Sequence, residues 1–312
     1  MAKWNKNDIP DLSSKTALVT GANSGLGFET SKELARKGCQ VILASRNMKK
    51  ATKALNQINK LIPKAKVQVM QLDLASLTSI KEFSAQFHLA FNRLDLLCNN
   101  AGVMALPYCK TEDDFEMQFG TNHLGHFALT GLLLDILLAT ENSRIVTTCS
   151  LIRTKIYFND LNWEQSYSRW NAYGQSKLAN LLFTYELQRR LTSIQSKTIS
   201  VACHPGYTST NLQFAGPKMS DSKLNQKFMS LANYLFAQKV EMGILPCLYA
   251  LISSDVKGGN CIAPRGIFEW FGYPQKVNNR TKKDKVTAAR LWAVSEELTG
   301  INYAFSDLNN QR

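Results

Sequence analysis

The chain has 312 residues, 45% of them hydrophobic, and its 37 Lys and Arg against 24 Asp and Glu give a formal net charge of +13. This is the composition of a globular protein with a substantial core. Because the basic residues are scattered and form no block, we expect a basic solvated surface that attracts anionic small molecules, and no nucleic-acid partner.

Neither a signal peptide nor a membrane span is expected. Residues 1–15 are polar and contain Pro10, and the longest apolar stretch, Phe127 to Ala139, is interrupted by Asp135 and too short to cross a bilayer. The seven cysteines form no CxxC pair and lie mostly among apolar residues. These features predict reduced thiols in a cytoplasmic protein, with no disulfide framework and no metal site.

A glycine-rich turn between a strand and a helix predicts a phosphate site near the start of the chain. Residues 15–20 form a short β-type run, and the helix after the turn ends at Gly38. Glycines let the backbone approach a pyrophosphate, and a helix N-terminus directs free N–H groups at it. The predicted cofactor-binding residues here are Gly21, Asn23, Ser24, Gly25, Leu26 and Gly27.

The end of the second predicted strand, 40–44, indicates which dinucleotide binds. In dinucleotide folds this position meets the adenosine ribose, where an acidic residue favours NAD and a basic one favours NADP. The strand is followed by Ser45 and Arg46, and the planar guanidinium suits a phosphate. A solvent-facing arginine at the start of the next helix is the alternative, but the position favours NADP(H) over NAD.

The strand–helix alternation continues along the chain. A helix over 47–62, a strand over 66–72, a helix over 77–91 and a strand over 94–98 predict a doubly wound, Rossmann-type α/β fold with one parallel sheet covered by helices on both faces. The loops after two of these strands supply further predicted cofactor residues. These are Asp73, Leu74, Asn100, Ala101 and Gly102. Asp73 touching adenine and Asp73 capping a helix are equally compatible with its position.

We expect a single domain over 1–312. It comprises an N-terminal extension (1–14), a substrate lid (about 207–240) and a C-terminal extension (about 264–312). Between them we predict a buried helix over 121–140, strands over 144–150, 198–203 and 260–263, and a helix over 241–253. A final amphipathic helix carries Val286, Leu291, Val294 and Leu298 and is stopped by Gly300.

Tyr173 and Lys177 are the candidate chemical centre. On a helix, residues four positions apart lie on one face. A phenol ordinarily titrates near pH 10, and a nearby ammonium favours the phenolate, so we expect Lys177 to lower the pKa of Tyr173 toward neutrality. Such a pair exchanges a proton with an alcohol or carbonyl oxygen. Alone, the spacing is more often that of a surface pair.

Together these motifs resemble the short-chain dehydrogenase/reductase family. The matching residues are Thr20-Gly21-Ala22-Asn23-Ser24-Gly25-Leu26-Gly27, Asp73-Leu74, Asn99-Asn100-Ala101-Gly102, Asn122, Ser150, Tyr173 with Lys177, and Pro205-Gly206. Finer features are similar to the retinol-dehydrogenase branch, whose relatives include light-dependent protochlorophyllide oxidoreductases. They are Asn122-His123-Leu124-Gly125-His126-Phe127, Ser176-Lys177-Leu178-Ala179-Asn180, His204-Pro205-Gly206 and the tail 291–298.

The resemblance implies a role for each matching residue. Tyr173 would be the general acid/base, with Lys177 beside it and holding the nicotinamide ribose. Ser150 would bind the substrate oxygen, and Asn122 would support a proton relay. The loop after the sixth strand, with Pro205, Gly206 and Thr208, would flank the nicotinamide, with Thr210 as a further candidate. The implied reaction is hydride transfer between nicotinamide and a carbonyl or alcohol carbon.

Large apolar residues in the loops at the strand ends favour a bulky apolar carbonyl or alcohol substrate, such as a retinoid or lipid aldehyde, although the same residues are equally suited to packing a lid. They are Val103, Met104, Leu106, Tyr108, Ile152, Ile156, Tyr157, Phe158, Trp163, Tyr207, Leu212 and Phe214. Light-driven reduction of protochlorophyllide is one alternative, and a non-catalytic NADP(H)-binding sensor or scaffold is another. Pairing of the helices over 121–140 and 170–190 in a homodimer is left open.

Overall fold

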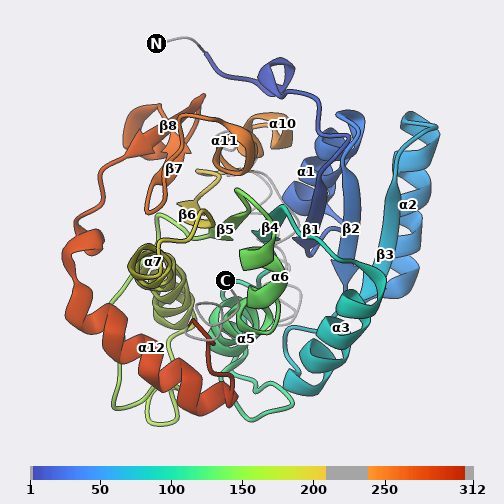
Figure 1. The fold of residues 1–312 in the computed structure, drawn as a ribbon. Helices are drawn as coiled ribbons and strands as arrows, with labels where there is room; N and C mark the ends of the chain where they lie inside the picture. Colours follow the sequence, from blue (N-terminus) through green and yellow to red (C-terminus); the bar gives the residue numbers. More distant parts are fainter. Residues whose placement is uncertain (1–2, 209–237, 306–312) are drawn as a thin grey trace, which may run out of the picture.

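In this computed structural model, which describes residues 3–208 and 238–305, the strands form one sheet in the order β3-β2-β1-β4-β5-β6-β7-β8 (Figure 1). All neighbours pair in parallel except β7 and β8, which are antiparallel. The strands are β1 (Thr16–Thr20), β2 (Gln40–Ser45), β3 (Val67–Gln71), β4 (Leu96–Asn99), β5 (Arg144–Thr148), β6 (Ile199–Cys203), β7 (Cys261–Pro264) and β8 (Pro274–Val277). The predicted doubly wound α/β fold is confirmed.

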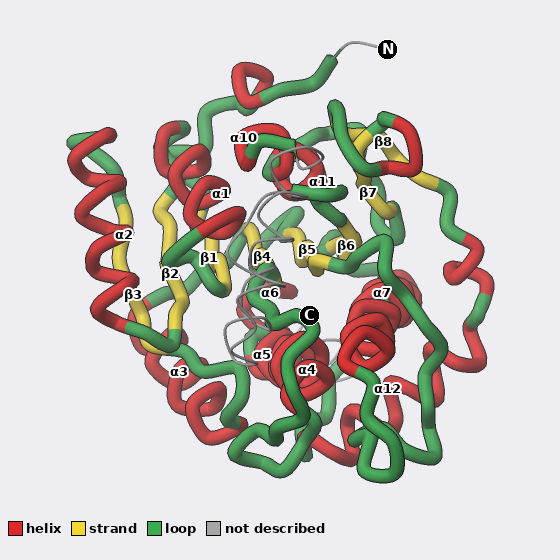
Figure 2. The backbone as a smooth tube through the Cα atoms, turned by 180° about the vertical axis from the view of Figure 1, so that it is seen from behind, coloured by secondary structure: helices red, strands yellow, loops and turns green. Residues whose placement is uncertain are grey.

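Helices cover both faces of this sheet (Figures 1 and 2). The longer ones are α1 (Gly25–Arg36), α2 (Met48–Leu61), α3 (Leu77–Ala90), α5 (Gly125–Leu132), α6 (Leu134–Ala139), α7 (Arg169–Ser193), α11 (Leu245–Ile252) and α12 (Lys285–Thr299). The shorter elements are η1 (Lys6–Asp8), α4 (Met117–Phe119), η2 (Gly120–Leu124), α10 (Val240–Gly243), η4 (Ile267–Glu269) and η5 (Arg280–Lys283).

The strand side chains alternate between two cores, as the pleat requires. Leu18 of β1 packs with α3, α5 and α7 on one face, while Val19 packs with α1, α2 and α11 on the other. Ile9 and Leu12, from the predicted N-terminal extension, are buried in this second core. The strands are therefore buried on both sides, which explains their continuously apolar sequences.

Two predicted helices are interrupted. The segment predicted as one helix over 121–140 begins earlier, at α4, passes through a π-helical turn (η2) and breaks at Leu133 between α5 and α6. The helix predicted over 241–253 is split into α10 and α11 at Ile244, because Pro246 has no N–H to donate and occupies the first turn of α11.

The C-terminal region contains an element that the sequence did not indicate. β8 pairs antiparallel with β7, so the loop between them, residues 265–273, forms a hairpin loop at the carboxyl end of β7. The final helix is confirmed as α12, and Gly300 adopts the left-handed conformation at its end. Val286, however, is 83% exposed and not part of the buried face.

Candidate active site

Two glycines of the turn after β1 lie so close to neighbouring parts of the protein that neither position has room for a Cβ. A Cβ on Gly27 would lie 2.6 Å from both the Gly21 carbonyl oxygen and Asn100 Nδ2, and one on Gly21 would lie 3.0 Å from Ala101. α1 begins at Gly25, and within the described structure the Ser24 side chain makes no capping hydrogen bond. The first N–H groups of α1 are therefore available to an anion. This cradle fits a pyrophosphate.

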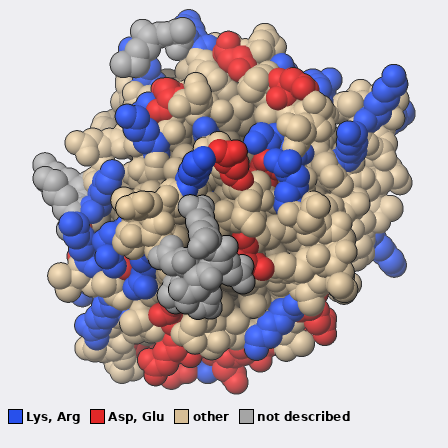
Figure 3. Space-filling view, in the orientation of Figure 1, with Lys and Arg blue, Asp and Glu red and all other residues tan. Residues whose placement is uncertain are grey.

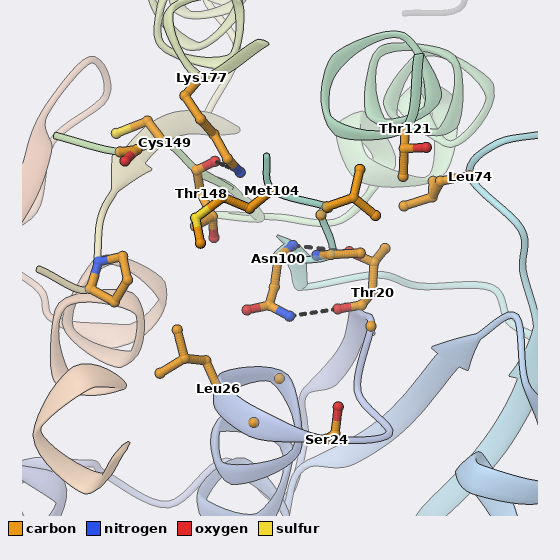
Figure 4. Close-up of a pocket in the computed structure, with 18 of the residues that line it drawn as sticks. Thr20, Ser24, Leu26, Leu74, Asn100, Met104, Thr121, Thr148, Cys149 and Lys177 are labelled. Carbon is orange, nitrogen blue, oxygen red and sulfur yellow. Dashed lines mark hydrogen bonds between the residues drawn. The ribbon is translucent and has the colours of Figure 1, made fainter. Parts of the chain in front are cut away.

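The turn after β4 is tied to the end of β1. Asn100 Nδ2 donates to the Thr20 carbonyl oxygen at 2.8 Å, and the backbone N–H groups of Asn100 and Ala101 both donate to Thr20 Oγ1 at 2.9 Å (Figure 4). His126 Nε2 lies 2.9 Å from the same hydroxyl. The carboxyl ends of two neighbouring strands are thus held at fixed distance beside the glycine-rich turn.

The end of β2 carries more positive charge than Arg46 alone supplies. Arg46 Nη1 lies 3.7 Å from Asp73 Oδ2, with the Arg46 side chain 70% exposed, and Ser45 Oγ donates to Asn23 Oδ1 at 3.1 Å. Asp73 also accepts from the Ala75 N–H. Lys50, one turn into α2, lines the same end of the cavity and was not singled out from the sequence.

One cavity of about 980 Å³ runs from this basic end to Tyr173 and Lys177. It brings together every predicted cofactor residue within the described parts of the chain, namely Gly21, Asn23, Ser24, Gly25, Leu26, Gly27, Ser45, Arg46, Asp73, Leu74, Asn100, Ala101, Gly102, Tyr173, Lys177, Pro205, Gly206 and Thr208. Ser150 lines it as well, just beyond the end of β5. Thr210 and most of the predicted lid lie outside the described residues.

At the far end, α7 carries Tyr173 and Lys177 on one face. Lys177 Nζ lies 5.8 Å from the centre of the Tyr173 ring and donates to the Thr148 carbonyl oxygen at 3.3 Å (Figure 4). Both residues are nearly inaccessible, at 5% and 3% exposed. The polar groups therefore meet in a pocket that is closed to bulk water on the α7 side.

Burial, and not the ammonium, governs the pKa of Tyr173. Burial raises this pKa from 10.0 to about 12, and a hydrogen bond with Ser150 offsets only part of the increase. Burial also lowers the pKa of Lys177 from 10.5 to about 8. The prediction that the pKa of Tyr173 is lowered toward neutrality is therefore wrong for the protein by itself, because the cost of desolvating the phenolate outweighs the stabilisation from the hydrogen bond with Ser150.

Asn122 lies behind the cavity wall. It sits in the π-helical turn η2, where its Nδ2 donates to the Val103 carbonyl oxygen and to Ser176 Oγ, both at 2.9 Å. Its Oδ1 accepts from the Val103 N–H at 2.7 Å. π-helical turns often re-aim a side chain at a functional site. Here the Asn122 side chain holds the backbone of Val103, next to Gly102, through two hydrogen bonds.

The apolar end of the cavity differs from the predicted substrate wall. Of the predicted residues, Val103, Met104, Ile152 and Tyr207 line it. Within the described chain the remaining ones pack elsewhere: the Trp163 ring lies tilted against Tyr157 with the ring centres 4.6 Å apart, and the Tyr108 and Tyr167 ring centres are 5.1 Å apart. Leu212 and Phe214 lie outside the described residues. The wall residues that were missed are Met117, Thr121, Leu151, Trp170 and Trp270. Trp170 precedes Tyr173 by one helical turn, so helical spacing was a usable signal for it.

Known proteins resemble this chain in sequence and in fold. A family model described as short chain dehydrogenase matches residues 15–219. Human retinol dehydrogenase 13 is 42% identical over 299 residues, which is 92% of this chain and 85% of that protein. Mouse retinol dehydrogenase 14 is 41% identical over 300 residues, 92% of this chain and 86% of that protein.

Solved structures agree with these sequence relatives. An uncharacterized protein from Mycobacterium paratuberculosis is 42% identical, with a TM-score of 0.79 over 97% of this chain and 99% of that one. A short chain dehydrogenase from Shigella flexneri, complexed with NADP, shares the fold with a TM-score of 0.60 at 24% identity, over 81% of this chain and 98% of that one.

The chain is an oxidoreductase that acts on alcohol or carbonyl groups. It belongs to the short chain dehydrogenase family, and the predicted similarity to the retinol-dehydrogenase branch is confirmed. In the part of the chain that the structure describes, every helix is too short or too polar to traverse a bilayer.

Proposed function

We propose that the protein is an NADP(H)-dependent oxidoreductase that transfers a hydride between nicotinamide and a carbonyl or alcohol carbon of a bulky apolar substrate. One observation carries the proposal: a single cavity has a glycine-rich cradle with Arg46 and Lys50 at one end and Ser150, Tyr173 and Lys177 at the other. The retinol dehydrogenases among its relatives support the substrate class.

The residues present suit each part of the cofactor. The N-terminus of α1 would hold the pyrophosphate, Arg46 and Lys50 the 2′-phosphate, and Lys177 the nicotinamide ribose. The turn over 100–102 would support the rings, and the loop over 205–208 would flank the carboxamide. When bound, the cofactor supplies or accepts the hydride at nicotinamide C4.

The protein supplies the proton. With a pKa of about 12, Tyr173 is protonated at neutral pH, so in carbonyl reduction its hydroxyl donates to the substrate oxygen while Ser150 hydrogen-bonds the same oxygen. Lys177, whose Nζ lies 5.8 Å from the centre of the Tyr173 ring, would stabilise the phenolate that is left when Tyr173 gives up its proton. Asn122 acts by holding the backbone of Gly102 and Val103 in place.

The substrate would bind against the apolar end of the cavity. Met104, Met117 and Ile152 offer adaptable apolar contacts, and Trp170 presents a ring edge-on to Tyr173, with the ring centres 6.3 Å apart. A substrate whose oxygen reaches Tyr173 would lay its apolar body on these side chains. A wall of this size and composition favours a retinal- or lipid-aldehyde-like compound over a small ketone.

The test is NADPH oxidation with aldehydes and ketones of graded size, in wild type and in Tyr173→Phe. We expect turnover with bulky apolar carbonyls, its loss in Tyr173→Phe, and NADPH affinity within about threefold of wild type in that variant. Tyr249→Phe, which removes a hydroxyl that donates to Asp255 outside the cavity, is the matched control. Turnover retained by Tyr173→Phe would remove this residue from its role. NADPH binding without turnover of any carbonyl would favour a sensor, and reduction of protochlorophyllide only under illumination would favour the light-driven reaction.

A further inference from the structure

The hairpin loop over 265–273 reaches the cavity from a part of the chain that the sequence treats as an extension. Since β7 runs parallel to β6, its carboxyl end lies at the same edge of the sheet as the site, and β8 starts back from there. Trp270 of this loop lines the cavity. Phe268 and Glu269 both adopt left-handed backbone conformations, with φ of 54° and 60°. Two adjacent residues in this costly conformation mark a loop that its surroundings hold firmly.

The inner side of the hairpin loop is bonded to the loop that follows β6. Glu269 Oε2 lies 2.8 Å from Nε2 of His204, which is 1% exposed. The Gly206 N–H donates to His204 Nδ1 at 3.3 Å, so Nε2 carries the ring proton that is donated to Glu269. The Tyr207 N–H donates to the Trp270 carbonyl oxygen at 2.8 Å. The hairpin loop is thus bonded to the loop after β6 on both sides of Gly206, at His204 and at Tyr207.

A residue with a side chain could not replace Gly206 in this arrangement. Its φ is +67°, and a Cβ there would overlap the Trp270 carbonyl group. The two loops therefore touch backbone to backbone. Gln238 adds a second connection, since its Nε2 donates to the Pro205 carbonyl oxygen at 2.6 Å and its Oε1 accepts from the Gly272 N–H at 3.1 Å.

The charges support a stable link between Glu269 and His204. The hydrogen bond with His204 lowers the pKa of Glu269, so the carboxylate is ionised at neutral pH. A charged acceptor strengthens the bond to the imidazole N–H. The outer side chains of the loop, Ile267 and Phe268, are 69% and 77% exposed and take no part in the connection.

We propose that Glu269 is a positioning residue, which acts through His204 to hold the loop over 205–208 in the shape that receives the nicotinamide end of the cofactor. This inference rests on the proposed function for the identity of the ligand, but not for the contact between the loops. The C-terminal hairpin is then part of the cofactor site and not an appendage to it.

The experiment compares Glu269→Ala, Glu269→Gln and wild type by NADPH titration, steady-state kinetics and hydrogen exchange. Glu269→Ala removes the acceptor, and we expect the dissociation constant and KM for NADPH to rise about tenfold while kcat stays within about threefold. Glu269→Gln keeps an oxygen that accepts from His204 and should restore affinity to within about threefold of wild type. A variant that merely destabilised the fold would reduce the fraction of active enzyme. Its apparent kcat would fall, while its KM for NADPH would stay as in wild type.

Glu141→Ala is the matched control, because it breaks an ion pair with Lys197 near the amino ends of β5 and β6, whereas the cavity lies at the carboxyl ends of the strands. It should leave NADPH affinity unchanged. If Glu269→Ala binds NADPH as wild type does, or if Glu269→Gln is as weak as Glu269→Ala, the inference is overturned.

Hydrogen exchange separates this inference from the proposed function. The amides of Gly206 and Tyr207 should exchange faster in Glu269→Ala than in wild type or Glu141→Ala, in protein without any ligand. Should wild type fail to bind NADPH, the proposed function fails, yet faster exchange in Glu269→Ala would still show that Glu269 holds the loop. Unchanged exchange at these two amides would contradict the positioning role even if NADPH binds normally.

Discussion

The buried amine of Lys177 is costly to the fold at neutral pH. Its pKa falls from 10.5 to about 8, so between these values the unfolded chain holds a proton that the folded chain has lost. Stability from this group therefore rises as the pH rises from 8 to 10.5, and the full cost is present below pH 8. The difference in pKa corresponds to a cost of about 3 kcal/mol.

Replacing this amine should stabilise the protein. We expect Lys177→Met to raise the free energy of unfolding by about 2–3 kcal/mol at pH 7, to raise it much less at pH 10, and to abolish turnover. Urea unfolding at both pH values measures the effect. Lys197→Met, which removes an amine that is 70% exposed, should stay within about 0.5 kcal/mol of wild type at both. An equal gain at pH 7 and pH 10 would show that desolvation of the ammonium is not its origin.

Arg46 should set the choice of cofactor. It lies at the basic end of the cavity with Lys50, and a carboxylate there would stand beside Asp73 and repel a 2′-phosphate. Arg46→Asp should reduce the ratio of kcat/KM for NADPH to that for NADH at least tenfold, roughly the worth of one charged contact. Lys49→Asp makes the same change in charge three residues away, at an exposed position outside the cavity wall. If both variants shift the ratio equally, general electrostatics and not a local contact decides the preference.

At the residue scale, the sequence identified those cavity residues that belong to motifs. It missed those that reach the cavity only in the folded protein. The glycine-rich turn, Arg46, Ser150, Tyr173 and Lys177 carry recognisable spacing, and all line the cavity. Trp270 lies in the loop of the β7–β8 hairpin, which was not predicted, so no local pattern could place Trp270 in the cavity wall. The pKa of Tyr173 depends on desolvation, which has no sequence signature.

At the scale of elements, long apolar runs were predictable and short or interrupted ones were not. β8 has four residues and begins with Pro274 at an edge of the sheet, where neither alternation nor β-propensity is visible. In the π-helical turn, the Asn122 side chain is hydrogen-bonded to Val103 in the loop after β4, a contact that has no local sequence signature. Helix boundaries at Gly38 and Gly300 were readable because glycine at a left-handed position is a local requirement.

α12 covers helices that the sequence left open to pairing between subunits. Trp292, 2% exposed, has its ring centre 5.1 Å from that of Phe127 in α5, 5.9 Å from that of Phe183 in α7 and 4.5 Å from that of Tyr303. The apolar character of α5 and α7 is thus accounted for within one chain. A homodimer is not needed to explain it.

Removing this indole should weaken the whole fold. Trp292→Ala leaves a cavity where four aromatic rings meet, and we expect a loss of about 3–5 kcal/mol in the free energy of unfolding. NADPH affinity of the folded protein should change little, because Trp292 is not in the cavity wall. Val286→Ala in the same helix, at an 83% exposed position, should cost less than about 0.5 kcal/mol. A small loss in Trp292→Ala would mean that α12 is only loosely attached.

At the scale of the whole molecule, the excess of positive charge acts at a distance. Lys and Arg side chains are spread over separate parts of the face seen in Figure 3, with acidic side chains between and below them. On this face such a distribution gives no continuous track for a polyanion, but a net charge of +13 draws small anions toward the surface. Anions drawn to the surface then meet two neighbouring positive charges, Arg46 and Lys50, at one end of the cavity.

Cofactor binding should therefore depend on salt. Raising the ionic strength from about 0.01 M to 0.1 M shortens the screening length from about 30 Å to about 10 Å, so attraction from the distant surface is lost while contacts at the site persist. We expect the dissociation constant for NADPH to rise several-fold over this range, and that for NADH to rise less because NADH lacks the 2′-phosphate. Titrations at both ionic strengths, repeated with Arg46→Asp, measure the two contributions. In the variant the salt dependence of NADPH binding should fall toward that of NADH, because Arg46 no longer attracts the 2′-phosphate while Lys50 still does. Equal salt dependence of the two cofactors in wild type would mean that the basic end of the cavity does not distinguish them.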